Sequence, residues 1–126
     1  MKTALVLFAH GARDPEWAAP LRRVRASIVQ RSPAMPVELA FLEFLAPTLP
    51  ECAAELIRQG ADKVVILPMF IARGGHLKRE VPEMLDALRQ VYPDVEFVLQ
   101  QAVGENAAVI RAMADVALEL AELPPA

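Results

Sequence analysis

The feature that most constrains the fold is an apolar run over residues 64–69, VVILPM, in which polar and apolar side chains do not alternate. Such a run, rich in β-branched residues, is typical of a strand buried on both faces, as in a parallel sheet covered by helices. Pro68 marks its end, because proline cannot donate a ladder hydrogen bond. Residues 3–9, TALVLFA, form a similar run at the start of the chain. The two runs predict a parallel sheet.

The rest of the chain alternates between strand and helix patterns. Further strands are predicted over residues 37–45 and 95–99. One helix is expected to begin at a capping box formed by Thr48 and Glu51 and to end at Gly60. The other helices are expected over residues 17–28, over residues 80–91 and after the capping residue Asn106.

This alternation predicts one α/β domain over residues 1–126, a four-stranded parallel sheet flanked by helices on both faces. In the last helix four apolar side chains at helical spacing are expected to face inward: Val109, Met113, Val116 and Leu120.

Composition narrows the classes of function. The net charge of −3 argues against general nucleic-acid binding. No apolar run reaches the roughly 18 residues that a membrane span needs, and residues 1–3 lead directly into a strand pattern without a leader. Cys52 is the single cysteine and cannot form an internal disulfide, which fits a reducing compartment. We expect a cytoplasmic protein without nucleic-acid or membrane partners.

The two histidines of the chain occupy equivalent places. His10 follows the first strand and precedes Gly11, and His76 follows the third strand and the flexible pair Gly74 and Gly75. Ligands of open parallel sheets bind beyond the carboxyl ends of the strands. One histidine at such a place is usually a capping or solvated residue, but two at matching strand ends favour a shared site.

A carboxylate lies near the same predicted edge. Glu43 sits in the apolar run after residue 37, where a carboxylate is costly unless it has a partner. A solvated strand end is the simpler interpretation of Glu43 by itself. Imidazole nitrogens suit cobalt(II), nickel(II), iron(II) and zinc, and a site with two such ligands would hold an ion loosely enough to pass it on. Trp17 is expected in the core or at a cleft rim, and Cys52 as unreactive packing.

Three segments resemble one family. Residues 5–15, LVLFAHGARDP, are similar to a signature of hydrophobic residues followed by His-Gly-Ser-Arg. Residues 67–82, LPMFIARGGHLKREVP, resemble a second signature, Pro-x-Phe-Leu-x-x-Gly-x-His-x-x-x-Asp-(Ile/Val)-Pro, and residues 41–44, FLEF, resemble its Phe-Leu-Glu segment. The family is the small form of the sirohydrochlorin chelatases, class II chelatases that insert a divalent metal ion into a tetrapyrrole.

The resemblance implies roles for particular residues. His10 and His76 match the metal-binding and catalytic histidines, and Glu43 matches the assisting carboxylate. The metal ion is then a substrate, cobalt or alternatively iron or nickel, and no organic cofactor is expected. Because larger members carry two such domains, a one-domain chain implies a homodimer. The chain departs from the family pattern at three positions, which concern backbone or substrate hydrogen bonds: Ala12, Ala18 and Glu80.

Sirohydrochlorin carries peripheral carboxylates, so a positive field should help to capture it. Residues 63–79 contain basic side chains and no acidic one. We assign substrate binding to residues in and near this segment: Arg13, Arg73, Gly74, Gly75, Lys78 and Arg79. Two other classes of function stay open at this point. One is a carrier of metal or tetrapyrrole without turnover, and the other is a flavodoxin-like regulatory module with structural histidines.

Overall fold

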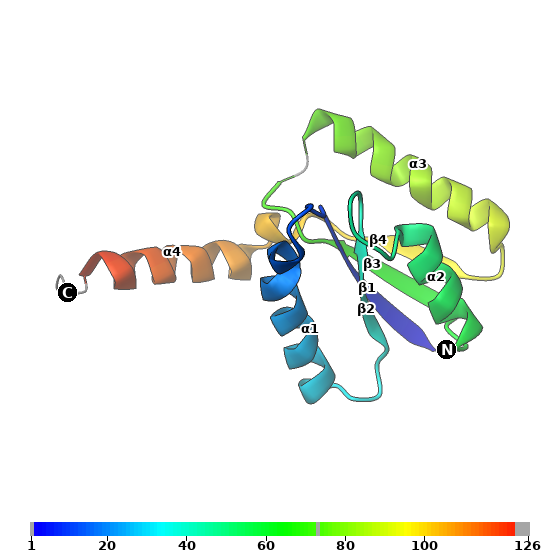
Figure 1. Ribbon diagram of the computed structural model, residues 1–126, viewed down its shortest axis with the longest axis horizontal. Helices are drawn as coiled ribbons and strands as arrows, with labels where there is room; N and C mark the ends of the chain where they lie inside the picture. Colours follow the sequence, from blue (N-terminus) through cyan, green and yellow to red (C-terminus); the bar gives the residue numbers. More distant parts are fainter. Residues whose placement is uncertain (1, 73, 123–126) are drawn as a thin grey trace.

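The centre of the computed structural model is a four-stranded parallel sheet with strand order β2-β1-β3-β4 (Figure 1). The structure describes residues 2–72 and 74–122, apart from the side chain of His76. The elements follow one another as β1 (Thr3–Ala9), η1 (Pro15–Ala18), α1 (Ala19–Arg31), β2 (Val37–Phe41), α2 (Leu49–Arg58), β3 (Lys63–Pro68), α3 (Gly75–Val91), β4 (Glu96–Leu99), η2 (Val103–Glu105) and α4 (Ala107–Glu122). The predicted α/β class and parallel sheet are confirmed.

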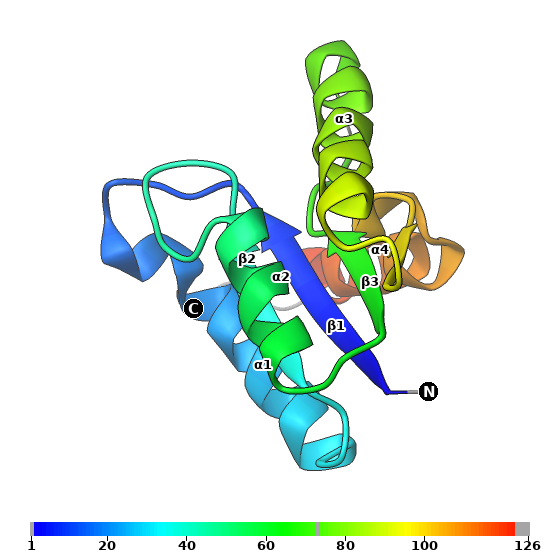
Figure 2. The same ribbon diagram turned by 90° about the vertical axis from the view of Figure 1, so that its right-hand side faces the viewer.

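Helices cover the two faces of the sheet unequally (Figures 1 and 2). On one face, α2 and α3 pack over the sheet with fully buried side chains, and on the other face α1 packs mainly against β2. The strands β1 and β3 alternate accordingly: Val64 and Ile66 point into the first cluster, whereas Leu67 borders the second. β1 lies between β2 and β3, so its carboxyl end is at the middle of the sheet edge.

Local sequence signals place the helix ends. Thr48 and Glu51 form the expected capping box of α2, and Gly60 follows the helix with a φ of 105°, a conformation that favours glycine. Asp14 caps η1 by accepting a hydrogen bond from the backbone N–H of Glu16. The side chain of Asn106 accepts one from the N–H of Ala108 at the start of α4.

Two predicted boundaries are wrong near the carboxyl edge. β2 ends at Phe41 rather than at residue 45, because the chain turns back there: the N–H of Phe41 bonds to the carbonyl of Pro47. α3 begins at Gly75, so Pro82 lies inside the helix and the backbone of His76 lies in its first turn, not in a loop. Packing explains the earlier start, since Leu77 borders the α3-side core one turn before the buried Val81.

The last helix contradicts the inward orientation predicted for its apolar side chains. α4 extends away from the sheet as an arm (Figure 1), and Met113, Val116 and Leu120 are exposed. Val91, at the end of α3, is also exposed. The helical periodicity identified the apolar side of α4 but not what covers it. Among the described residues, no helix is long and apolar enough to cross a membrane.

Candidate functional site

Three segments meet at the carboxyl edge of the sheet. They are the residues directly after β1, the loop 42–47 after β2, and the segment 69–72 after β3. The N–H of Leu42 bonds to the carbonyl of Ala9, and the N–H of Met69 bonds to the carbonyl of Phe8. Both neighbouring segments are therefore fixed against the end of β1, where His10 begins the next loop.

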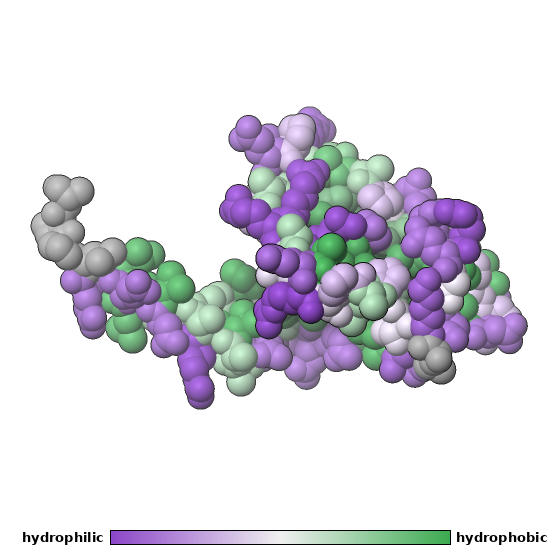
Figure 3. Space-filling model, turned by 90° about the horizontal axis from the view of Figure 1, so that it is seen from below, coloured by the Kyte–Doolittle hydropathy of each residue, from purple (hydrophilic) through white to green (hydrophobic). Residues whose placement is uncertain are grey.

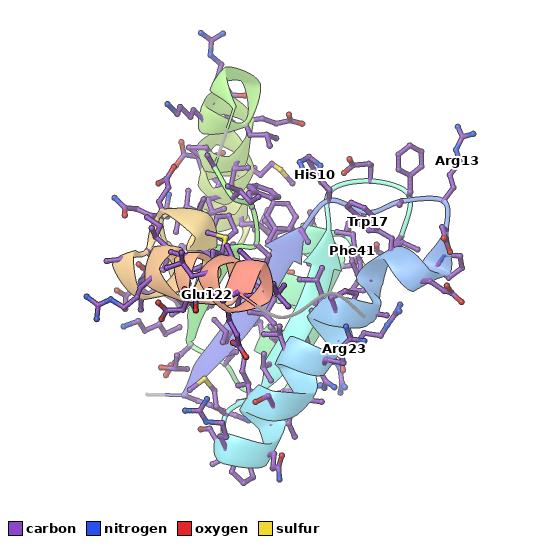
Figure 4. All side chains as sticks on the ribbon, turned by 90° about the vertical axis from the view of Figure 1, so that its left-hand side faces the viewer. His10, Arg13, Trp17, Arg23, Phe41 and Glu122 are labelled. Carbon is purple, nitrogen blue, oxygen red and sulfur yellow. The ribbon has the colours of Figure 1, made fainter. Side chains whose placement is uncertain are left out.

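His10 and Glu43 are in direct contact. The Nδ1 atom of His10 lies 2.9 Å from Oε1 of Glu43, and both side chains are partly exposed. Because Nδ1 is engaged by the carboxylate, Nε2 is the ring nitrogen that a metal ion can reach. The position of His10 at the sheet edge can be followed in Figure 4. The structure thus brings together two of the residues that the sequence singled out.

The loop that carries Glu43 is held in an unusual conformation. Phe44 has a φ of 68°, which is rare for a residue other than glycine, and the N–H of Leu45 bonds to the carbonyl of Glu43 at 2.8 Å. Residues in such conformations cost about 1–3 kcal/mol and cluster at functional sites. The second oxygen of Glu43, Oε2, is buried and has no hydrogen-bond partner among the described residues. A buried carboxylate oxygen of this kind is suited to receive a proton or a cation.

An apolar pocket of about 720 Å³ adjoins His10. The ring of Phe70 packs against the imidazole, with the ring centroids 4.8 Å apart and the planes inclined by 38°. Nε1 of Trp17 donates a hydrogen bond to the backbone carbonyl of His10 at 3.2 Å. The remaining lining is mostly apolar: Ala9, Glu16, Pro20, Leu21, Met69, Ile71 and Ala72. The volume falls within the range of small-molecule sites.

The predicted substrate-binding residues lie at several places around this edge. Arg13 is exposed, with its guanidinium carbon 5.4 Å from the centroid of the Phe44 ring, and Figure 4 shows it pointing away from His10. Lys78 and Arg79 are exposed near the start of α3, and Gly74 is the N-cap of that helix, directly before Gly75. Arg73 and the side chain of His76 lie outside the described residues.

Neither of the two glycines of the pair adopts a conformation that requires glycine. Gly74 has a φ of −69°, and a Cβ added to Gly74 or to Gly75 would meet no atom within 4 Å. Gly11 is different, because a Cβ there would stand 1.9 Å from the carbonyl oxygen of Glu43. Close packing in the site therefore requires glycine at position 11, beside His10.

Sequence reasoning missed the role of Phe70 and left Trp17 undecided between core and rim. The structure puts Trp17 at the rim of the pocket, with 57% of its surface exposed. Phe70 lies in the family-like segment 67–82, and its position two residues past Pro68 was the available signal. Cys52 is buried in α2, and burial together with the charge of Glu38 raises the pKa of its thiol to about 12. The expected unreactive packing role of Cys52 agrees with this environment.

Fold and site together define the class: an open parallel α/β protein with an imidazole–carboxylate pair beside an apolar pocket at its carboxyl edge. The model of the CbiX family matches residues 4–120, and the chain belongs to that family. A solved structure of a CbiX protein from Marinobacter aquaeolei VT8 shares the architecture, with a TM-score of 0.85, 26% identity and 97% of each chain covered.

Curated relatives match over part of their length. A sirohydrochlorin cobaltochelatase of Methanococcus aeolicus is 38% identical over 82 residues, which are 65% of this chain and 57% of the relative. One from Saccharolobus solfataricus is 37% identical over 81 residues, 64% of this chain and 62% of the relative. The matches therefore span about three fifths of these relatives. The Bacillus subtilis sirohydrochlorin chelatase SirB, solved with cobalt, has the same fold at a TM-score of 0.80, with 22% identity and 95% and 51% of the chains covered.

Proposed function

We propose that this chain inserts a divalent metal ion into sirohydrochlorin, with cobalt(II) as the first candidate and iron(II) or nickel(II) as alternatives. The observation that carries the proposal is the contact between His10 and Glu43 at the rim of an apolar pocket. Membership of the CbiX family and the similarity to sirohydrochlorin cobaltochelatases support the same reaction.

In this proposal His10 receives the ion through Nε2. Its Nδ1–H donates to Glu43, and such a carboxylate fixes the tautomer and the orientation of the imidazole ring. His76 is assigned as the second ligand from its place in the family motif. Imidazole is a good ligand for cobalt, iron and nickel in their divalent states. A site with two protein ligands leaves the remaining positions of the ion to water and then to the ring nitrogens of the substrate.

Besides orienting His10, Glu43 accepts a proton during metal insertion. Two N–H protons of the tetrapyrrole must leave as the divalent ion binds; a positioned carboxylate can accept one of them, and the other passes to solvent water. Its Oε2 atom is buried without a partner among the described residues, so a proton arriving there would relieve an unsatisfied acceptor. His10 then keeps the ion on one face of the ring while Glu43 takes the proton.

The apolar pocket and the surrounding cations bind different parts of the tetrapyrrole. Trp17 and Ile71 expose apolar surface beside His10, and a large planar ring can lie against them with exclusion of water. The ring's peripheral carboxylates are drawn to Arg13, Lys78 and Arg79, with Arg73 assigned from the sequence. The N-terminus of α3, where Gly74 and Gly75 lie, adds backbone dipoles that favour anions.

Two further expectations belong to this proposal. We infer that the protein works as a homodimer, which is supported by the exposed apolar side of α4 (Figure 3). We also infer a cytoplasmic location, which the free, buried Cys52 supports. No organic cofactor takes part in the proposed reaction.

The test is to mix the protein with cobalt(II) and sirohydrochlorin and to follow the absorption spectrum of the tetrapyrrole. Spectral change over many turnovers, faster than the reaction without protein, is the expected result. A change that stops at one equivalent of protein would point to a carrier instead. If the spectrum changes no faster than without protein, the chelatase proposal is wrong and a regulatory module becomes the better hypothesis. Repeating the assay with iron(II) and nickel(II) ranks the metals.

A further inference from the structure

The pocket beside His10 has one carboxylate among the described residues that line it, that of Glu16. Besides His10, the other side chains of this lining are apolar or aromatic. Glu43 does not belong to the lining, although it contacts Nδ1 of His10 from behind the pocket wall. A molecule bound in the pocket therefore faces the carboxylate of Glu16 directly.

The backbone of Glu16 is held firmly, whereas its side chain is not. Asp14 accepts a hydrogen bond from the N–H of Glu16 at 2.9 Å, and the N–H of Ala19 donates to the Glu16 carbonyl. The next residue, Trp17, donates its indole N–H to the carbonyl of His10 at 3.2 Å, which ties η1 to the site (Figure 4). The exposed carboxylate of Glu16 forms no hydrogen bond or ion pair with another residue that the structure describes. It is an available acceptor at a fixed place.

A carboxylate at this place opposes the capture of the substrate. Sirohydrochlorin carries peripheral carboxylates, and its proposed capture uses exposed cations such as Lys78 and Arg79. Because like charges repel, Glu16 should weaken the binding of the tetrapyrrole. A negative charge that disfavours binding, yet lies in the wall of the pocket, is suited to act on a metal ion or on a proton.

The metal ion is the less suitable of these two partners. Among the side chains that the structure describes, no three of the types His, Cys, Asp and Glu are gathered as they would be around one ion. Glu16 therefore does not stand with His10 and Glu43 in the position of a third ligand. A proton makes a smaller demand, because one acceptor oxygen within hydrogen-bond reach of the ring is sufficient.

The proton balance of metal insertion leaves room for such an acceptor. A divalent ion replaces two N–H protons of the ring, and a single carboxylate holds only one of them at a time. In the proposed reaction Glu43 takes one proton, and the other passes to solvent water. We propose that Glu16 is the catalytic residue that takes this other proton from the ring and hands it to water.

The step is a proton transfer without any change of oxidation state. The N–H bond of the ring breaks, its electron pair stays on the nitrogen that binds the ion, and an O–H bond forms on Glu16. Because Glu16 is exposed, water then removes the proton and restores the carboxylate for the next turnover. The inference rests on the proposed metal insertion and adds one catalytic residue to it.

Glu16→Gln tests this step, because glutamine keeps the shape of the side chain and removes its charge and its basicity. We expect kcat to fall by about tenfold to 100-fold, less than the ~10²–10⁴-fold of a sole general base, since water still accepts the proton slowly. The KM for the tetrapyrrole should stay the same or decrease, because a repelling charge is lost, and the KM for the metal should not change. The matched control is Glu96→Gln, which replaces an exposed carboxylate at the amino edge of the sheet and should leave kcat and both KM values unchanged.

Chemical rescue separates proton transfer from a structural role. Glu16→Ala leaves space for a small carboxylate, so sodium formate should restore part of kcat, compared with sodium chloride at the same ionic strength. Glu16→Asp keeps a carboxylate and should also recover part of kcat. Formate should have no effect on the kcat of Glu96→Ala.

Three results would overturn the inference. The first is an unchanged kcat in Glu16→Gln; with a lower melting temperature, it would mean that Glu16 only stabilises the first turn of η1. The second is a loss of kcat that neither Glu16→Asp nor formate restores, and the third is a higher KM for the metal. The chelatase proposal is tested separately, since it fails only if the unmodified protein does not accelerate metal insertion.

Discussion

Gly11 and Glu43 are packed backbone to backbone, and a Cβ on Gly11 would lie 1.9 Å from the Glu43 carbonyl oxygen and 3.2 Å from the Leu45 nitrogen. Gly11→Ala should therefore push the Glu43 loop away from His10. We expect the free energy of unfolding to fall by about 1–3 kcal/mol, as for overpacked sites, and metal insertion to fall as well. Thermal unfolding and the initial rate of metalation measure the two effects.

Gly75→Ala is the matched control for stability, because a Cβ at Gly75 meets no atom within 4 Å and alanine favours the helix. It should unfold at the same temperature as the unmodified protein or at a higher one. Equal stability of Gly11→Ala and Gly75→Ala would contradict the close packing that we describe.

The contact between His10 and Glu43 predicts that substitutions of the two residues affect metal affinity and turnover differently. His10→Ala removes a metal ligand and should weaken metal binding and insertion together. Glu43→Gln keeps the shape but loses the charge and the proton acceptor, so we expect turnover to fall by about 10²–10⁴-fold with a smaller change in metal affinity. Both side chains are partly exposed, so the melting temperature should change little.

Metal titration, metalation rates and melting curves for both variants check this prediction. Asp86→Asn serves as the control, since this exposed carboxylate forms an ion pair with Arg89 of the same helix, α3. His76→Ala belongs in the same series, as the sequence assigns it the second ligand role. Near-normal rates in a folded His76→Ala protein would contradict that role.

Trp17 should act on the tetrapyrrole rather than on the metal ion. Trp17 is 57% exposed at the rim of the pocket, so Trp17→Ala removes apolar surface without emptying the core. We expect a higher KM for the tetrapyrrole at nearly unchanged KM for the metal. Trp17→Phe keeps an aromatic surface and should recover most of the affinity. An equal rise of both KM values would mean that Trp17 mainly positions His10 through its hydrogen bond to the His10 carbonyl.

The exposed cations at the start of α3 predict that the KM for the tetrapyrrole depends on ionic strength. Lys78→Gln with Arg79→Gln should raise the KM for the tetrapyrrole and flatten its dependence on ionic strength, because exposed charges act over about 10 Å at 0.1 M salt. Arg31→Gln is the control, since Arg31 lies at the opposite end of α1 from the carboxyl edge. If KM at low salt is the same in all three proteins, these cations are only a solvated surface.

Cys52 predicts a change of stability at alkaline pH. Burial, assisted by the charge of Glu38, raises the pKa of the thiol from an ordinary 9.0 to about 12. Between these values the unfolded chain loses the proton and the folded protein keeps it, so the free energy of unfolding decreases as pH rises. Cys52→Ala should show a weaker decrease over this range. In the native protein at pH 8 a thiol reagent should react slowly, and unfolding by denaturant should make the reaction fast.

Much of the site could be predicted from the sequence, because the ends of buried strands can be recognised from their apolar runs. Apolar runs without alternation predicted β1 and β3. Because the sheet is parallel, the residues that follow these two strands lie at the same edge. His10 and Glu43 were therefore expected near one another, and the structure places them 2.9 Å apart. The Thr48 capping box and the Gly60 helix end were also correct, since both depend on a few neighbouring residues.

What the sequence determined alone is the set of local and periodic features: the strands, the helix caps, the apolar strip of α4 and the residues at the carboxyl edge. The tertiary structure decided where those features meet. The turn at Phe44, the start of α3 at Gly75 and the exposure of Val116 depend on contacts distant in sequence. Periodicity reports which side of a helix is apolar, but only packing determines whether that side meets its own sheet or remains uncovered.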